Sequence, residues 1–182
     1  KIAPFKSQNM ALNSFVTRDG LEIARAQVVQ AQAARLDPDI RMNPILLKPN
    51  ANHLTQVILN GKVIGDYSWR DYMKFKPKAF EVVKESYNSL CRDYDAILLE
   101  GAGSPAEVNL KHDDIVNMGM AAYSQSPVML VGDIDRGGIF ASFIGTMDIL
   151  NEEERKMVAG FLINRFRGDV SLLQGALDFT YN

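Results

Sequence analysis

The stretch Ala96-Ile-Leu-Leu-Glu-Gly-Ala-Gly-Ser104 joins a short apolar run to an acidic residue and two glycines. The run Ala96–Leu99 has the length and composition of a strand that is buried on both faces. Glu100 follows it directly, and Gly101 and Gly103 allow the backbone to approach a ligand closely. The pattern predicts a buried strand that delivers a carboxylate to the edge of a sheet.

Three more apolar runs of strand length occur along the chain: Ile2–Phe5, Val128–Val131 and Val158–Ile163. Between the runs lie segments of helical length: Leu21–Leu36, Tyr72–Tyr94, Ile115–Ser124 and Ile139–Leu150. Strands that alternate with helices predict an α/β fold with a mostly parallel sheet flanked by helices. Pro77 is expected in the first turn of its helix rather than in the interior.

The segment 56–65 interrupts this alternation. It contains two apolar runs on either side of Asn60-Gly61, a pair that favours a two-residue hairpin turn. We therefore expect a small β-hairpin that leaves the main sheet. Because no repeat or low-complexity linker is present, residues 1–182 are predicted to form a single domain.

The composition excludes several classes of protein. The net charge of −2 provides no basic field for nucleic acid or an anionic membrane, so neither is expected as a partner. No apolar run is long enough to span a membrane, and the first residues do not resemble a signal peptide. The single Cys91 excludes an internal disulfide and a cysteine-built metal site, and it favours a reducing, cytoplasmic compartment.

Charged residues follow the first two predicted strands, at the edge where open parallel sheets bind ligands. Lys6 could meet a phosphate as a point charge; the alternative is a solvated loop lysine. Glu100 has the position of a magnesium ligand in many phosphoryl-transfer enzymes; the alternative is an exposed glutamate in a turn.

Polar residues also follow the other two strands. Asp133 and Asp135 bracket a strand end, Arg136 could clamp a carboxylate or a phosphate, and Gly137-Gly138 opens a helix. A capping aspartate with a surface arginine is the alternative. Asn164 offers the donor and acceptor needed to read a purine edge, although asparagine is also an ordinary turn residue.

Two further acidic residues are candidates at predicted helix starts. Glu22 begins the helix Leu21–Leu36, where the helix dipole favours a carboxylate in any case. Asp114 has the position of an N-cap for the helix at Ile115. His53 and His112 are isolated in the sequence and are not expected to bind metal.

Six segments together resemble the synthetase part of the cobyric acid synthase family. They occur in the order of that family and cover nearly the whole chain. The segments are Ala3-Pro-Phe-Lys-Ser-Gln-Asn-Met10, Arg41-Met-Asn-Pro-Ile-Leu-Leu-Lys-Pro49, Glu100-Gly-Ala-Gly-Ser-Pro-Ala-Glu107, Asp114-Ile-Val-Asn-Met-Gly119, Asp133-Ile-Asp-Arg-Gly-Gly138 and Asn164-Arg-Phe-Arg-Gly-Asp169.

The resemblance implies a P-loop NTPase fold shared with dethiobiotin synthetase and corrin a,c-diamide synthase. It implies an enzyme of cobalamin biosynthesis that uses ATP, Mg²⁺ and ammonia from glutamine. Four peripheral carboxylates of adenosylcobyrinic acid a,c-diamide would be amidated through acyl phosphates to give adenosylcobyric acid. Glutamine would be hydrolysed by a separate glutaminase domain that follows the synthetase.

The resemblance also implies which residues bind the reactants. Glu100 and Glu22 would coordinate Mg²⁺, and Lys6 would bridge the nucleotide phosphate and the substrate carboxylate. Asp114 would position or activate the substrate carboxylate or the ammonia, and Asn164 would contact adenine. The residues expected on the substrate side are Asp133, Asp135 and Arg136.

Two parts of the family pattern are not found in residues 1–182. The phosphate loop that ends in Gly-Lys-Ser/Thr is expected upstream of Lys6, and the glutaminase is expected downstream. We therefore expect these 182 residues alone to be inactive in ATP turnover. A homo-oligomer is possible.

Three alternatives remain open. Corrin a,c-diamide synthase and dethiobiotin synthetase share the fold and the carboxylate activation, although Ser104-Pro-Ala-Glu107 and Asp133-Ile-Asp-Arg136 favour cobyric acid synthase. A remote alternative is a partitioning-type P-loop ATPase that acts as a binding module, with a second lysine in its phosphate loop.

Overall fold

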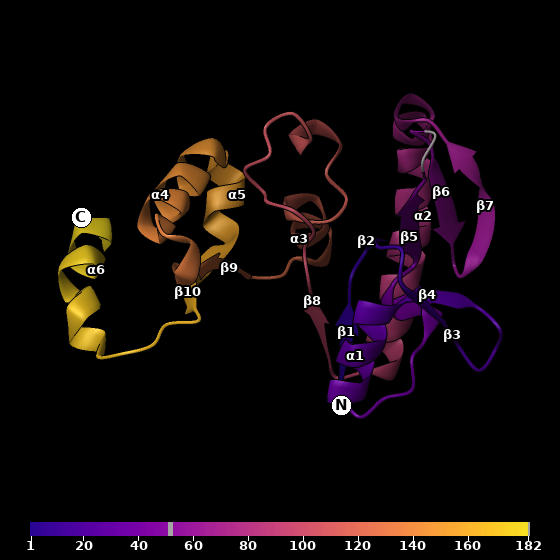
Figure 1. The fold of residues 1–182 in the computed structure, drawn as a ribbon, viewed down its shortest axis with the longest axis horizontal. Coiled ribbons are helices and arrows are strands. Elements are labelled where there is room, and N and C mark those ends of the chain that lie inside the picture. Colours follow the sequence, from indigo (N-terminus) through magenta and orange to yellow (C-terminus); the bar gives the residue numbers. More distant parts are fainter. Residues whose placement is uncertain (51–52, 182) are drawn as a thin grey trace. The chain divides into compact units, whose positions relative to one another are not determined.

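A computed structural model describes residues 1–50 and 53–181 and confirms the predicted α/β class (Figure 1). The chain divides into two compact units. The first comprises Lys1–Gly103 with Asp113–Asn117, and the second comprises Ser104–His112 and the residues from Met118 onward. The single enzymatic domain stays a prediction, because one functional domain can contain two compact units.

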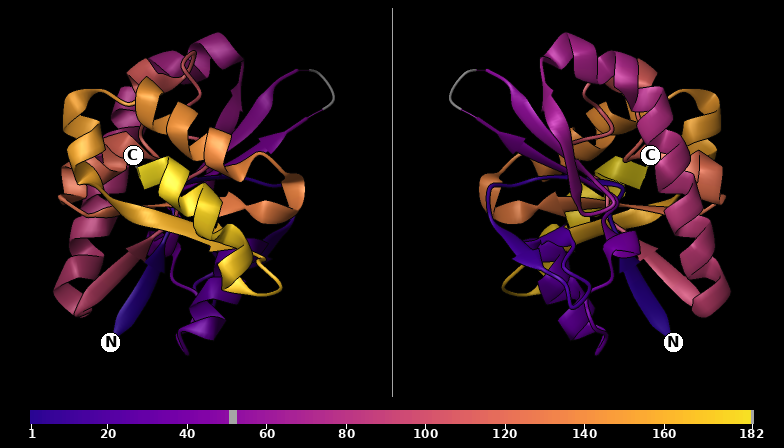
Figure 2. Two further views of the ribbon diagram at one scale, coloured as in Figure 1. Left: turned by 90° about the vertical axis from the view of Figure 1, so that its left-hand side faces the viewer. Right: turned by 90° about the vertical axis from the view of Figure 1, so that its right-hand side faces the viewer.

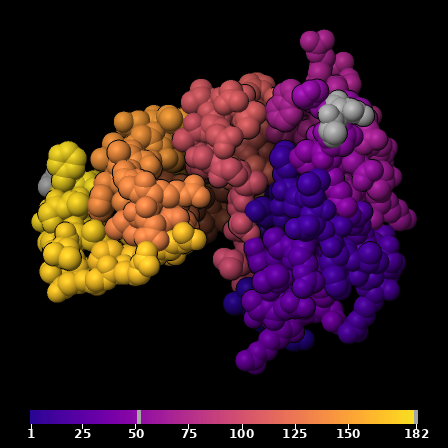
Figure 3. All heavy atoms as spheres, in the orientation of Figure 1, coloured from indigo at the N-terminus to yellow at the C-terminus, as the bar shows by residue number. Residues whose placement is uncertain are grey.

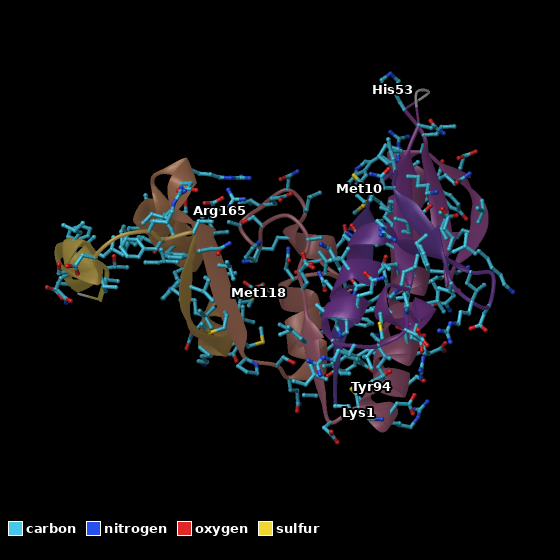
Figure 4. All side chains as sticks on the ribbon, turned by 60° about the horizontal axis from the view of Figure 1, so that its bottom comes forward. Lys1, Met10, His53, Tyr94, Met118 and Arg165 are labelled. Carbon is cyan, nitrogen blue, oxygen red and sulfur yellow. The ribbon has the colours of Figure 1, made fainter. Side chains whose placement is uncertain are left out.

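The first unit contains two predicted strands as a parallel pair. Strand β1 (Ile2–Phe5) pairs with β8 (Ala96–Leu99), and Phe5 lies opposite Leu99. Lys1 and Tyr94 lie at the start of this pair (Figure 4), where the Lys1 carbonyl accepts hydrogen bonds from the chain that enters β8. The residues after Phe5 and Leu99 therefore leave the sheet side by side at its carboxyl edge. The prediction that β8 is buried on both faces is wrong, because Leu98 is 71% exposed.

The predicted hairpin is confirmed, and it belongs to a larger sheet. Asn60 and Gly61 both have positive φ, 46° and 75°, as the tight turn requires. The four strands of this sheet, in spatial order, are β2 (Gln8–Met10), β5 (Ile45–Pro49), β6 (Thr55–Leu59) and β7 (Lys62–Tyr67). Only the first pair is parallel, and β5 and β6 lie side by side in Figure 2.

The predicted start of the first helix is wrong. Helix α1 (Arg25–Ala33) begins after Glu22, which lies in β4 (Glu22–Ala24), antiparallel to β3 (Ser14–Val16). The reason is a tertiary contact: the Glu22 N–H donates to the Gly61 carbonyl at 3.0 Å. Because the hairpin turn takes this donor, the backbone at Glu22 stays extended.

Helix α2 (Trp69–Asp93) covers the core of the first unit. Its N-cap is Ser68, whose hydroxyl accepts from the Asp71 N–H, so the helix begins earlier than predicted. Pro77 lies in the helix interior, which corrects the prediction of a first-turn proline. The α2 side chain Tyr87 meets Phe5 edge to face at 5.7 Å, which places α2 over β1. In Figure 3 the N-terminal residues, in indigo and purple, lie together on one side of the view.

The second unit contains the other two predicted strands as a second parallel pair. Strand β9 (Val128–Asp133) pairs with β10 (Val158–Asn164), and Asp133 lies opposite Asn164. Helix α4 (Ile139–Ile149) packs on this pair and forms a core of three residues, which are Leu130, Ile139 and Phe143. The other helices of the described residues are η1 (Ile40–Met42) in the first unit and, further along the chain, η2 (Lys111–Asp113), α3 (Met118–Ser124), η3 (Ile134–Arg136), α5 (Glu152–Met157), η4 (Val170–Leu173) and α6 (Gln174–Tyr181).

Two predictions for this half of the chain are wrong in detail. Helix α3 begins at Met118 and not at Ile115. Strands β9 and β10 are not buried on both faces: Met129 and Val131 of β9 are exposed, because α4 covers the opposite face. Among the described residues, no helix combines the length and apolar character needed to cross a membrane.

Candidate active site

The carboxyl edge of the β1–β8 pair brings Lys6 and Glu100 together. The Lys6 ammonium donates to Glu100 Oε1 at 2.9 Å, and the amide of Gln30 on α1 donates to Glu100 Oε2. The backbone fixes both residues, because the Lys6 N–H donates to the Met42 carbonyl and the Glu100 N–H to that of Phe5. The Lys6 side chain is 15% exposed and that of Glu100 is 47% exposed, so solvent or a ligand can reach the carboxylate.

Glu22 occupies a second ion pair in the first unit. Its carboxylate accepts from the ammonium of Lys48, which also donates to the Ser14 hydroxyl at 3.0 Å. Burial would raise the pKa of Glu22, but the hydrogen bonds from Lys48 and Ser14 outweigh it and hold this pKa below its usual value. Glu22 is therefore an ionised carboxylate that already has a cation beside it.

Asp114 is fixed to the glycine loop that follows Glu100. Asp114 Oδ1 accepts from the Val116 and Asn117 N–H groups, both at 2.8 Å, in a turn that precedes α3. The prediction that Asp114 is the N-cap of a helix at Ile115 is wrong, because α3 begins at Met118. The Asn117 amide in turn donates to and accepts from the backbone of Ala102. Gly101 is required here, since a Cβ atom at this position would lie 2.1 Å from Asn117 Oδ1.

The carboxyl edge of the β9–β10 pair carries the other candidates. The Asp133 carboxylate lies 3.6 Å from Arg136 and 3.5 Å from Arg165. Asp135 accepts two contacts from the Arg167 guanidinium, at 2.8 and 2.9 Å. These guanidinium groups are largely exposed, so this edge is an open, mixed-charge surface.

Asn164 and the paired glycines also lie at this edge. Asn164 Oδ1 accepts from the Arg165 N–H at 3.0 Å, which leaves its amide N–H groups without a hydrogen bond among the described residues. Gly137 and Gly138 have φ of 73° and 66°, and Gly138 is the N-cap of α4. Glycine is needed at both positions for this left-handed backbone.

The residues fit Mg²⁺ only as a partial ligand set. Carboxylate oxygens such as those of Glu100 and Glu22 are the donors that this ion prefers, and Mg²⁺ is usually held by one or two carboxylates together with water and substrate phosphates. Among the described residues, no cluster of three or more His, Cys, Asp or Glu side chains could hold a metal ion. Glu100 and Glu22 belong to separate ion pairs, with Lys6 and with Lys48, and each offers one carboxylate to such an ion.

Several site residues were missed in the sequence. Lys48 follows the apolar run Ile45–Leu47 just as Lys6 follows Ile2–Phe5, so the same rule would have found it. Arg165 and Arg167 belong to the segment that was singled out for Asn164. Gln30 carries no sequence signal, because only the packing of α1 brings it to Glu100.

The fold is that of an α/β protein with charged residues beyond the carboxyl ends of parallel strands, which is where proteins of this class bind ligands. Comparison with curated proteins shows which proteins the chain is similar to in sequence. The chain is 59% identical to the cobyric acid synthase of Nitratidesulfovibrio vulgaris over 98% of its length, which is 33% of that protein. It is 56% identical to the cobyric acid synthase of Caldanaerobacter subterraneus subsp. tengcongensis over its full length, which is 36% of that protein.

A longer relative matches equally well. The adenosylcobalamin biosynthesis bifunctional protein CobDQ of Leptospira interrogans is 60% identical over 98% of this chain and 21% of its own length. No protein-family model and no solved structure matches the chain. The predicted resemblance is confirmed: the chain is homologous to cobyric acid synthases and spans about a third of their length.

Proposed function

We propose that this segment carries the acid-activation site of an ATP-dependent amidoligase that amidates peripheral carboxylates of a corrin in cobalamin biosynthesis. The observation that carries the proposal is the Lys6–Glu100 pair at the carboxyl edge of two parallel strands. The names of the relatives support the corrinoid substrate. The conversion proposed is that of adenosylcobyrinic acid a,c-diamide to adenosylcobyric acid.

The chemistry requires a carboxylate to be activated before ammonia attacks it, because a carboxylate oxygen is a poor leaving group. The substrate carboxylate attacks the γ-phosphorus of ATP, the bond to the ADP oxygen breaks, and an acyl phosphate forms. Ammonia then adds to the acyl carbon, phosphate leaves, and loss of a proton gives the amide. Negative charge accumulates around the transferred phosphoryl group, so the site must supply positive charge.

The residues of the first unit supply these functions in the proposal. Lys6 holds the oxyanions of the nucleotide phosphate and the acceptor carboxylate near each other. Bound Mg²⁺ would neutralise phosphate charge, with Glu100 and Glu22 as its protein ligands. Asp114, fixed by two backbone N–H groups, orients the acceptor or the ammonia.

In the proposal, residues of the second unit bind adenine and the corrinoid, and two further functions belong to parts of the protein outside this segment. Asn164 contacts adenine through its amide N–H groups, and the residues assigned to the corrinoid are Asp133, Asp135 and Arg136. The phosphate loop and the glutaminase that delivers ammonia are assigned to parts of the protein outside this segment. A cytoplasmic location accords with this assignment.

The proposal is tested with the full-length protein, ATP, Mg²⁺, glutamine and the purified corrin acceptor. We expect phosphate release that depends on the acceptor, together with amidated corrin by mass spectrometry. Glu100→Gln removes the charge but keeps the shape, and we expect it to lower kcat/KM at least ~100-fold with an unchanged circular dichroism spectrum.

The control is Glu153→Gln, which removes an exposed carboxylate paired with Lys156 in α5 and is expected to leave turnover unchanged. Near-normal turnover of Glu100→Gln would remove Glu100 from the site. Parallel assays with cobyrinic acid and with the dethiobiotin precursor distinguish the related synthetases. Acceptor-independent ATP hydrolysis alone would contradict amidation.

A further inference from the structure

Lys76 is a buried lysine that forms no direct contact with an opposite charge in the part of the chain that the structure describes. It lies on the buried face of α2 and is only 8% exposed. Among the described residues its ammonium takes part in no hydrogen bond and no ion pair. Lysine is almost never buried in this way unless it is paired, because removing an ammonium from water is costly. A side chain kept at such a cost needs an explanation other than stability.

The position of Lys76 connects it with the proposed site. Tyr72 precedes it by one helical turn on the same face and donates its hydroxyl hydrogen to Gln8, two residues after Lys6. Further along the same helix Tyr87 contacts Phe5, the residue before Lys6. Lys76 lies on α2 between Tyr72 and Tyr87. The stretch of α2 that contains Lys76 is therefore bracketed by contacts with the residues on either side of Lys6.

The charges that face Lys76 come from the turn that holds Asp114. Burial lowers the pKa of the Lys76 ammonium, and Asp113 and Asp114 offset only part of that effect. The two aspartates therefore attract the ammonium from a distance without pairing with it. An anion that bound directly to the ammonium would remove the remaining cost of burial.

We propose that Lys76 is a substrate-binding residue whose ammonium takes a carboxylate of the acceptor. The inference rests on the proposed function and adds a lysine of α2 to the cations that the proposal assigns to the acceptor. A carboxylate suits this position better than a phosphate does, because Asp113 and Asp114 repel a doubly charged group more strongly than a singly charged one.

The first test compares Lys76→Met and Lys76→Arg with Lys78→Met in the full-length enzyme. Lys78 is exposed on the same helix, so its substitution controls for loss of charge. Loss of a charge-assisted hydrogen bond should raise the KM for the acceptor by about 10-fold or more in Lys76→Met and leave the KM for ATP unchanged. Lys76→Arg should recover part of the loss, and Lys78→Met should behave as the wild type.

Stability separates binding from a structural role. Lys76→Met should keep or raise the melting temperature, because methionine fills the same space without a buried charge. The inference would be overturned if Lys76→Met left the KM for the acceptor unchanged. It would also be overturned if Lys76→Met lowered the melting temperature or prevented folding. Failure of the wild-type enzyme to amidate the corrin would instead contradict the proposed function.

The second test does not depend on turnover. Lysines of the full-length protein are labelled with trace acetic anhydride, with and without each reactant, and Lys76 and Lys78 are compared by mass spectrometry. We expect the corrin acceptor to protect Lys76 and Mg-ATP not to protect it, with Lys78 unaffected by both. Protection by Mg-ATP alone would assign the position to phosphate, and protection by neither would leave no ligand there; either result overturns the inference.

Discussion

The two parallel strand pairs end in charged residues of the same kinds, but they hold them differently. At the edge of β1 and β8, Lys6 is 15% exposed and bonds to Glu100, which Gln30 also contacts. At the edge of β9 and β10, the Arg167 side chain that pairs with Asp135 is 79% exposed. Similar sequence patterns thus produce a fixed, partly buried pair in one unit and an open surface pair in the other.

The difference follows from what packs against each strand pair. Helices α1 and α2 both contribute side chains to the first edge: Gln30 bonds to Glu100, and Tyr72 bonds to Gln8, two residues after Lys6. The second pair is covered by α4 on one face, and its edge carries guanidinium groups that reach into solvent. Fixed charges are suited to a reaction centre, whereas exposed arginines are suited to recognition of a large acidic ligand.

The largest expected effect on stability tests how rigid the first edge is. In Gly101→Ala the new methyl group would displace the Asn117 amide from Ala102 and loosen the turn of Asp114. We expect a loss of about 1–3 kcal/mol in the free energy of unfolding, measured with urea, because a bidentate amide contact is broken.

Gly145 in α4 of the second unit is the matched control. A Cβ atom there meets nothing within 4 Å, so Gly145→Ala should stabilise by about 0.5–1 kcal/mol through helix propensity. Equal effects of the two substitutions would contradict the rigid glycine loop at the first edge.

These contacts show where sequence reasoning succeeds and where it fails. The four strands are found because each is an apolar run of the right length, and the hairpin because Asn60-Gly61 has one favoured turn. Lys6 and Glu100 are found together because equal register places the residues after Phe5 and Leu99 side by side. Local pattern is sufficient for all of these features.

The failures depend on contacts between distant segments. Glu22 was placed in a helix because its neighbours have helical spacing, but the Gly61 carbonyl holds it in a strand. The sequence does not predict a buried Lys76, because a lysine in an amphipathic helix normally lies on the polar face. The local sequence at neither residue shows the packing of distant segments that decides its position.

A smaller effect tests the Glu22–Lys48 pair through pH. Because the pKa of Glu22 is lowered in the folded state, its ionised form stabilises the fold above the ordinary value of 4.5, and this stability is lost as pH falls through the lowered pKa. Glu22→Gln should therefore cost about 1 kcal/mol at pH 7, and the difference from wild type should shrink toward pH 3. Urea unfolding at several pH values measures this.

Asp135→Asn in the second unit supplies the contrast for Glu22→Gln. Its partner Arg167 is mostly exposed, so the substitution should change the unfolding free energy by less than about 0.5 kcal/mol. A constant cost of Glu22→Gln from pH 7 to pH 3 would show that packing, and not the charge of Glu22, stabilises this part of the first unit.

The smallest expected effect concerns the coupling energy within each ion pair. Double-mutant cycles of Lys6→Met with Glu100→Gln, and of Arg167→Met with Asp135→Asn, isolate the pairwise energies from urea unfolding. The Lys6–Glu100 coupling should be about 1 kcal/mol, since solvent still reaches Glu100, and the Arg167–Asp135 coupling should be below about 0.5 kcal/mol. Salt should abolish the second coupling and leave most of the first, because screening acts mainly on exposed charges. If both couplings were equal and equally sensitive to salt, burial would not distinguish the two edges, and the proposed separation between a reaction centre and a recognition surface would lose its physical basis.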